Sequence, residues 1–200
     1  MTANSDTTIL DAFPFSAFPK MPRLNREVIV TEKIDGTNAQ VFIADDGVTM
    51  LVGSRTRWIT PEQDNFGFAR WAADNRDELL KLGPGRHFGE WWGHGIQRAY
   101  GMTKGERRFS LFNVSRWADN AVRPTCCHVV PELFRGPFST NVVARCIEGL
   151  RTDGSVVAPG FMQPEGVIVF HVAANAGFKV TLEKDEEPKS AAEWRAKQVA

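Results

Sequence analysis

Short apolar runs separated by polar turns characterise the start of the folded region. Val28–Val30 is followed by the polar stretch 33–38 and then by a second apolar run, Ala39–Ala44. A third run, Val48–Val52, is joined to the second through Asp46-Gly47, which is a strong hairpin signal. The pattern predicts strand, turn and strand, with the polar stretch at the edge of an antiparallel sheet.

Two segments carry helix signals. Thr60-Pro61-Glu62-Gln63 offers an N-cap, a proline at the first helical position and a capping-box glutamine, which predicts a helix running towards Leu82. A second helix is expected to begin near Ser139 or Thr140. Four apolar side chains then fall on one helix face, as in a packed helix: Val143, Cys146, Ile147 and Leu150.

The remaining apolar runs predict an α+β fold in which helices flank antiparallel β-sheets. Further strands are expected at 86–92, 108–117, 126–134, 166–173 and 177–182, with the last two forming a hairpin. Residues 94–104 are expected to form a loop that exposes polar groups.

The chain length suits one domain with short appendages. Residues 1–26, where phenylalanines alternate with prolines, are expected to form an extended arm packed on the domain. Residues 27–185 then form the domain itself, and 186–200 a tail that could form a short helix.

Composition narrows the classes of function. Of the 200 residues, 42% are hydrophobic, including 14 Phe and 6 Trp, which is enough for a sizeable core. Lys+Arg and Asp+Glu are both 24, so nucleic-acid binding would require a local basic patch. Four basic residues that could supply one are Arg98, Lys104, Arg107 and Arg108.

The cysteine and histidine patterns exclude two kinds of scaffold. Three cysteines, two of them adjacent, form neither a disulfide framework nor a metal pair, which favours a reducing, cytoplasmic setting. The four histidines lack metal-ligand spacing, so a zinc site is not expected. No apolar run approaches membrane-spanning length, which predicts neither export nor membrane insertion.

The polar stretch 33–38, Lys-Ile-Asp-Gly-Thr-Asn, is the first candidate for chemistry. A lysine delivered from the end of a strand into a turn is well placed to act as a nucleophile, provided that the site lowers its pKa. Asp35-Gly36 is also an ordinary turn sequence, and from this stretch alone the turn is the simpler interpretation.

The order of later segments changes that interpretation. Five segments follow the lysine in sequence: 53–57 (GSRTR), 88–93 (FGEWWG), 109–114 (FSLFNV), 164–169 (PEGVIV) and 178–181 (FKVT). This series resembles the nucleotidyltransferase motifs of ATP-dependent polynucleotide ligases and mRNA capping enzymes. Residues 89–97 (GEWWGHGIQ) resemble more closely the corresponding segment of RNA ligases of the RNA-editing-ligase-like clade.

The resemblance implies an ATP-grasp-like nucleotidyltransferase domain and a self-adenylating lysine. Lys33 would attack the α-phosphorus of ATP, assisted by Lys179 and by Mg²⁺ or Mn²⁺. The remaining roles follow from the same motifs. Arg55 would help hold the nucleotide and later the RNA end, and Glu90 would accept hydrogen bonds from the ribose hydroxyls. Phe112 would stack on the adenine, and Glu165 would help bind the metal. Glu32 completes the set of nucleotide-binding residues.

Two positions depart from the family pattern. Asn113 stands where an aspartate usually follows the stacking phenylalanine, which weakens any metal or charge role there. Thr181 stands where a second lysine usually follows Lys179, so Lys184 or Lys189 would have to supply that charge.

Three functions remain open at this point. The first is an ATP-dependent RNA ligase that transfers AMP to a 5′-phosphate and joins it to a 3′-hydroxyl. The second is a DNA ligase or capping-type guanylyltransferase with the same lysine chemistry, and the third is a non-catalytic module that binds nucleotide or RNA ends. The expected partners are RNA ends, nicked or single-stranded, and a further domain or protein that helps grip them, with the protein itself a monomer and no membrane involved.

Overall fold

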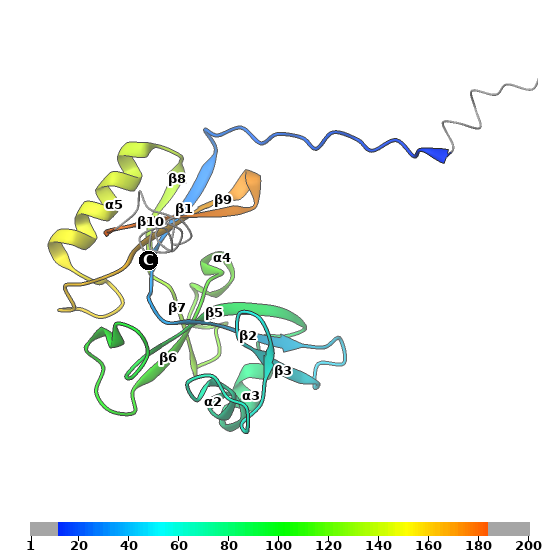
Figure 1. The fold of residues 1–200 in the computed structure, drawn as a ribbon, viewed down its shortest axis with the longest axis vertical. Helices are drawn as coiled ribbons and strands as arrows, with labels where there is room; N and C mark the ends of the chain where they lie inside the picture. Colours follow the sequence, from blue (N-terminus) through cyan, green and yellow to red (C-terminus); the bar gives the residue numbers. More distant parts are fainter. Residues whose placement is uncertain (1–11, 184–200) are drawn as a thin grey trace, which may run out of the picture.

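The computed structural model describes residues 12–183, which form two β-sheets packed against each other, with helices on their outer faces (Figure 1). One sheet has four strands and the other has six. We call them sheet A and sheet B. The architecture is α+β, as the sequence predicts.

Sheet A is antiparallel throughout, with strand order β10-β9-β1-β8. Its strands are β1 (Glu27–Lys33), β8 (Glu132–Pro137), β9 (Gly166–His171) and β10 (Ala176–Thr181). Helix α5 (Thr140–Asp153) covers one face, where Leu150 packs with four strand valines: Val28, Val30, Val167 and Val169. The predicted helix start and the C-terminal hairpin are both confirmed.

Sheet B is mixed rather than purely antiparallel, because β6 and β7 run parallel. In spatial order, its strands are β4 (Trp58–Ile59), β3 (Met50–Gly53), β2 (Thr37–Ile43), β5 (Gly85–Gly93), β6 (Arg107–Leu111) and β7 (Cys127–Val129). Helices α2 (Phe68–Asp74) and α3 (Arg76–Leu80) cover its outer face, and Phe68, Trp91 and Phe109 lie in the core between them. The predicted hairpin through Asp46-Gly47 is confirmed by the pairing of β2 with β3.

The chain crosses between the sheets at the polar stretch 33–38. The apolar runs on either side of it were expected to lie in one sheet, but β1 belongs to sheet A and β2 to sheet B. The stretch predicted as one strand at 126–134 is likewise divided into β7 of sheet B and β8 of sheet A. Lys33 therefore lies at the end of a central strand, where one sheet passes the chain to the other.

The helix predicted from Thr60 to Leu82 begins later and is interrupted. Phe66 and Gly67 have left-handed backbone angles (φ 50° and 77°), which exclude a continuous helix before α2. Asp64, rather than Thr60, satisfies the amides at the start of α2, because its carboxylate accepts hydrogen bonds from the amides of Ala69 and Arg70.

The strand predicted over 108–117 is also shorter. It ends at Leu111, and residues Val114–Trp117 form the one-turn helix α4. The side chain of Asn113 accepts a hydrogen bond from the amide of Arg116, so the residue that departs from the family pattern caps this helix. The loop at 94–104 is partly buried, contrary to expectation: it contains the 3-10 turn η1 (Ala99–Gly101) and buries Ile96 and Tyr100.

The described part of the N-terminal arm leads away from the sheets (Figure 1). Phe13, Phe15 and Phe18 are 76%, 92% and 92% exposed, so the packing expected of these side chains is not seen. Residues 1–11 and the predicted tail helix lie outside the described residues. Within 12–183, no helix is both long and apolar enough to cross a membrane.

Candidate nucleotide-binding site

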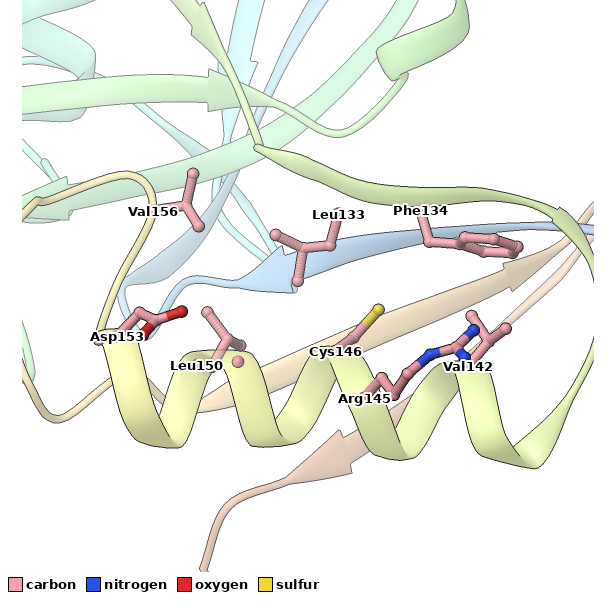
Figure 2. A pocket seen from close by; sticks show the side chains of 10 residues that line it. Leu133, Phe134, Val142, Arg145, Cys146, Leu150, Asp153 and Val156 are labelled. Carbon is pink, nitrogen blue, oxygen red and sulfur yellow. The ribbon is translucent and has the colours of Figure 1, made fainter.

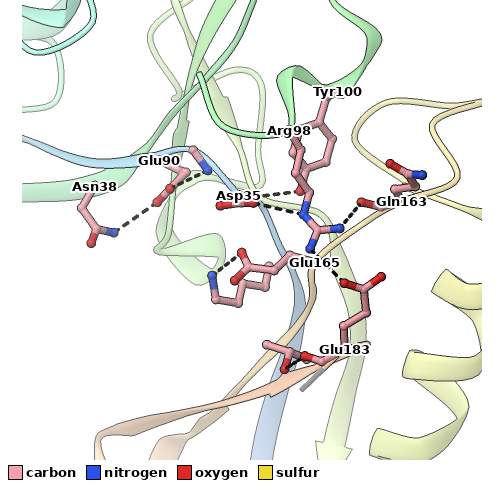
Figure 3. A network of polar contacts seen from close by, with 11 residues as sticks. Asp35, Asn38, Glu90, Arg98, Tyr100, Gln163, Glu165 and Glu183 are labelled. Carbon is pink, nitrogen blue, oxygen red and sulfur yellow. Dashed lines mark hydrogen bonds and ion pairs between the residues drawn. The ribbon is translucent and has the colours of Figure 1, made fainter. Parts of the chain in front are cut away.

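Lys33 and Glu165 come from neighbouring strands of sheet A. Lys33 ends β1, its backbone pairs with Gly166 of β9, and Glu165 immediately precedes that strand. The Lys33 ammonium forms an ion pair with the Glu165 carboxylate (Figure 3). Because side chains alternate along β1, Lys33 lies on the face opposite the α5 core, directed at sheet B.

Two glycines allow the backbone to approach closely around this pair. A Cβ on Gly36 would lie 2.5 Å from the carbonyl oxygen of Trp91, so only glycine fits where the turn after Lys33 meets β5. Gly166 has φ +151°, and a Cβ there would lie 2.2 Å from the carbonyl oxygen of Val180. The chain bends at Gly36, and this close approach brings the segment after Lys33 to sheet B.

Glu90 is the acidic group that sheet B contributes. It lies on β5 and is 7% exposed, and its carboxylate accepts hydrogen bonds from the amide of Gly36 (3.0 Å) and from Nδ2 of Asn38 (3.1 Å). Burial raises its pKa to about 7, and the positive charge of Lys33 opposes that rise. Glu90 is therefore held at the turn and close to Lys33.

A strap of residues 94–106 ties this turn to both sheets. Arg98 donates from Nε to Asp35 Oδ2 (3.1 Å) and from Nη1 to the carbonyl oxygen of Gln163 (3.0 Å), and Tyr100 accepts a hydrogen bond from the amide of Asp35 (2.8 Å; Figure 3). Tyr100 has a left-handed backbone (φ 51°) and is buried, and burial raises the pKa of its hydroxyl. Such a conformation is costly and is kept by surrounding contacts, which here fix the turn that follows Lys33.

Glu32, which the resemblance includes among the nucleotide-binding residues, is buried next to Lys33 in the sequence. Its side chain lies on the α5 side of the sheet and is 1% exposed. The carboxylate accepts hydrogen bonds from the hydroxyl of Ser155 (2.6 Å) and from the amides of Val156 and Val157 (2.9 Å each). Burial raises its pKa against these hydrogen bonds. The structure thus gives this side chain a role in holding the segment after α5, away from Lys33.

Phe112 lies close to Glu90 at the end of β6 in sheet B. Its amide donates to the carbonyl oxygen of Phe88 at 2.9 Å, so Phe112, which directly follows β6, lies opposite Phe88 of β5. Its side chain is 41% exposed, on the same face as Glu90. An aromatic ring presented in this way is available for a planar ligand.

Arg55 and Lys179 are exposed and more peripheral. Arg55 lies in the turn between β3 and β4, and no hydrogen bond or ion pair joins it to another described residue. Lys179 lies on β10 opposite Ile168, on the sheet face that Lys33 occupies. Gly166 of β9 pairs with Lys33 on one side and with Thr181 on the other. Thr181 therefore lies level with Lys33, about 10 Å away across two strand spacings. The expected alternatives, Lys184 and Lys189, lie outside the described residues.

Most of the basic residues expected to form a surface patch instead contact other residues of the protein. Arg98 is bound as described, and Arg107 donates to the carbonyl oxygens of His94 (3.0 Å) and Phe66 (2.7 Å). Arg108 packs over the ring of Trp92, and Lys104 is exposed. Three of the four cations are therefore committed to local structure.

The acidic groups suit a hard divalent ion held partly by water. Among residues 12–183, no three His, Cys, Asp or Glu side chains form a ready-made metal cluster. Glu165 and Asp35 nevertheless lie near enough to Glu90 to influence its charge. Mg²⁺ usually takes only one or two carboxylates and completes its shell with waters and phosphates, so the donor set fits such an ion.

A separate cavity of about 330 Å³ lies between α5 and β8 (Figure 2). Its lining includes Leu133, Phe134 and Cys146 with Arg145 and Asp153 at its edge. It lies on the α5 side of sheet A, opposite the face of Lys33, and the side chains assigned to the nucleotide site do not line it.

Two sheets that enclose a strand-end lysine define the class of protein: an α+β nucleotidyltransferase fold of the kind found in RNA ligases. A family model described as RNA ligase matches residues 26–183. The chain belongs to this family.

Solved structures support the fold. An arginine-to-alanine variant of the Naegleria gruberi RNA ligase with ATP and Mn is similar over 80% of this chain and 51% of that chain, at 21% identity and a TM-score of 0.60. A glutamate-to-alanine variant of the same enzyme with AMP and Mn is similar over 82% of this chain and 53% of that chain, at 20% identity and a TM-score of 0.60. The chain thus spans about half the length of these proteins. No curated protein sequence matches it.

The residues that hold Asp35 and Glu90 in place could not be identified from the sequence. Asp35 was visible as a turn residue, but its partners Arg98 and Tyr100 are 63 and 65 residues away. Arg98 carried a weak signal as one member of a basic cluster, which predicted surface binding instead of an internal tether. Asn38 ends the polar stretch 33–38, and its bond to Glu90 follows from a pairing of β2 with β5 that the sequence does not display.

Proposed function

We propose that the protein is an ATP-dependent RNA ligase that adenylates itself on Lys33. The observation that carries this proposal is the convergence of Lys33 and Glu165 from sheet A with Glu90 from sheet B. A nucleophile bordered by carboxylates from two packed sheets suits nucleotide activation, and membership of the RNA ligase family favours RNA as the substrate. The finer fold assignment, an ATP-grasp-like domain over residues 27–185, belongs to the same proposal.

The chemistry takes three steps. The unprotonated Lys33 nitrogen forms a bond to the α-phosphorus of ATP, the bond to pyrophosphate breaks, and the nitrogen loses a proton. A 5′-phosphate oxygen of the RNA then forms a bond to the phosphorus of the Lys33-bound AMP, the nitrogen–phosphorus bond breaks, and the Lys33 nitrogen regains a proton. The RNA 3′-hydroxyl finally attacks that 5′-phosphate, loses its proton and releases AMP.

The other site residues bind and orient the nucleotide. Glu90 would accept hydrogen bonds from the ribose hydroxyls, and Phe112 would stack on the adenine. Arg55 and Lys179 would approach the phosphates, and Arg55 the RNA end, with their positive charge. The buried carboxylate of Glu32 would act only by supporting the strand that carries Lys33.

Mg²⁺ or Mn²⁺ would be held by Glu165 and the nucleotide phosphates. When bound, the ion would neutralise charge that develops on the phosphate. Glu165 pairs with Lys33 in the ligand-free structure, so the same carboxylate orients the nucleophile and would meet the metal. Naegleria gruberi RNA ligase has been solved with ATP or AMP and Mn, which supports these cofactors.

The second candidate is a capping-type enzyme that uses GTP, or a DNA ligase, with the same lysine. The exposed ring of Phe112 does not distinguish one purine from another. The proposal also includes a further domain or protein that grips the RNA, and a monomeric state.

The test is covalent labelling with radioactive ATP or GTP and Mg²⁺ or Mn²⁺, followed by mass spectrometry. We expect one AMP on Lys33 from ATP, no label from GTP, and no label on Lys33→Ala. Lys81→Ala is a matched control, because Lys81 is an exposed lysine on the outer side of sheet B. Label from GTP would indicate a capping enzyme. Absence of label from both nucleotides, in a folded protein, would favour the non-catalytic module and contradict the proposal.

A further inference from the structure

The open face of sheet B continues beyond Glu90 as regular rows of side chains. Asn38 pairs with Glu90 in the first row, and Gln40 pairs with Phe88 in the next. Because Gln40 also pairs with Gly53, and Gly53 with Trp58, the second row reaches across four strands. Successive rows on one face are about 7 Å apart.

The third row adds a cation between aromatic rings. Phe42 pairs with Arg86, and the Arg86 guanidinium carbon lies 4.9 Å from the centre of the Phe42 ring and 5.3 Å from that of Trp58. Arg86 also donates to Oε1 of Gln40 at 3.1 Å, which fixes it across the sheet. We name Phe42, Trp58, Arg86 and Phe88 the aromatic platform.

The platform is exposed where the other face of the sheet is closed. Trp58 and Phe88 are 45% and 53% exposed, whereas His87 and Trp91, on the opposite face, are buried. Planar side chains of this size normally bury their surface, so an exposed group of them marks a binding surface.

We propose that the aromatic platform binds unpaired bases of the RNA strand whose end enters the nucleotide site. This inference rests on the proposed function and extends it to a specific surface. Aromatic rings and stacked arginines bind successive bases of single strands without strict sequence preference, because every base has a planar face.

Continuity and charge favour RNA as the occupant. Phe88 is adjacent to Phe112 and one row from Glu90, so a strand on the platform leads directly to the nucleotide site. The second and third rows contain one cation and no carboxylate among their paired residues. The surface is therefore complementary to a polyanion that carries planar groups.

The size of the platform disfavours a protein partner. A stable protein interface buries about 800 Å² on each side and uses roughly 20–30 residues. Three aromatic rings and one guanidinium provide much less, but they match the width of a few nucleotides.

The experiment compares affinities for a short single-stranded RNA and for the same sequence as a blunt duplex, by fluorescence anisotropy with the purified full chain. We expect Trp58→Ala and Phe88→Ala each to weaken single-strand binding about tenfold. Duplex binding should change little, because paired bases hide their faces. Phe178→Ala is the matched control, since Phe178 is an equally exposed ring on β10, outside the platform.

Conservative variants separate stacking from folding. Trp58→Tyr keeps a ring and should retain most of the affinity, whereas Phe88→Leu keeps apolar volume without a ring and should behave like Phe88→Ala. Unchanged affinity in both alanine variants would overturn the proposal. Equal losses for single strand and duplex, or a wild-type dimer that the variants convert to monomer, would also overturn it.

Labelling with ATP distinguishes this proposal from the proposed function. Platform variants should take up AMP on Lys33 at the wild-type rate. The wild type and all variants could fail to take up label while single-strand affinity still depends on Trp58 and Phe88. In that case the ligase assignment is wrong and the platform proposal is supported. If the wild type is labelled but has no measurable affinity for single-stranded RNA, the platform fails alone.

Discussion

Sheet A and sheet B contribute to the site in different ways. Sheet A delivers the charged groups: Lys33 on β1, Glu165 directly before β9, and Lys179 on β10. Sheet B delivers a buried carboxylate, Glu90, and an exposed aromatic surface that begins at Phe112. Under the proposed function, the reactive groups and the recognition groups are held by separate sheets and meet only where the sheets pack.

This division has a structural cost. A site formed between two sheets requires a fixed distance between them, and the chain crosses directly at 33–38 and again at 129–132. The apolar contacts between the sheets, including Ile29, Ile34 and Trp92, hold the two layers together. Substitutions can therefore probe sheet A, sheet B and the strap between them separately.

The largest effect is expected on sheet A. Glu165→Ala should slow self-adenylation about a hundredfold, because it removes the partner of Lys33 and, under the proposed function, a metal ligand at the reacting phosphate. Raising the Mg²⁺ or Mn²⁺ concentration should restore part of the rate. Glu183→Ala is the control, since this exposed carboxylate lies near Arg98 but does not contact Lys33. A loss of rate that is indifferent to metal would leave Glu165 only the role of orienting Lys33.

On sheet B, the effect should be on stability and should depend on pH. The pKa of Glu90 rises on folding from 4.5 to about 7, so its proton binds more tightly in the folded state. The resulting stability is present below pH 4.5 and is lost as the pH rises through about 7. Between about pH 5 and pH 8, the wild-type free energy of unfolding should fall by up to about 3 kcal/mol relative to Glu90→Gln.

Chemical denaturation at both pH values measures this difference. Glu148→Gln, on the exposed side of α5, should keep the wild-type pH dependence. If Glu90→Gln loses stability with pH as the wild type does, folding does not raise the pKa of Glu90, and sheet B does not hold the desolvated carboxylate described above.

The parts of this arrangement that could be predicted from sequence are those with local causes. The hairpin at 39–52 depends on Asp46, whose side chain accepts hydrogen bonds from the amides of Val48 and Thr49 two and three residues away. The start of α5 and its apolar face follow from spacing alone. The position of Lys33 at a strand end was likewise visible in the pattern of apolar runs.

The errors arise where distant contacts override local signals. The carbonyl oxygen of Phe66 accepts hydrogen bonds from Trp91 and Arg107, which stabilises a non-helical turn inside the predicted helix. The division of the runs around 33–38 between two sheets depends on strand pairing across more than a hundred residues, such as β1 with β9. Neither contact leaves a periodic signal in the sequence.

The smallest expected effect concerns the strap between the sheets. Arg98→Ala removes the hydrogen bonds to Asp35 and to Gln163, which lie two residues from Lys33 and from Glu165 respectively. We expect self-adenylation about tenfold slower with ATP affinity nearly unchanged, because a misplaced nucleophile costs rate rather than binding. The free energy of unfolding should fall by only about 1 kcal/mol, since the ion pair is partly exposed.

Two variants make the role of the strap specific. Lys104→Ala, on the same strap but exposed, should leave the rate unchanged. Arg98→Lys keeps the charge but cannot reach Asp35 and Gln163 with the same pair of donors, so it should recover only part of the rate. If Arg98→Ala weakens ATP binding and leaves the rate of the bound complex intact, Arg98 acts on the nucleotide itself. The alignment of the two sheets would then not depend on Arg98.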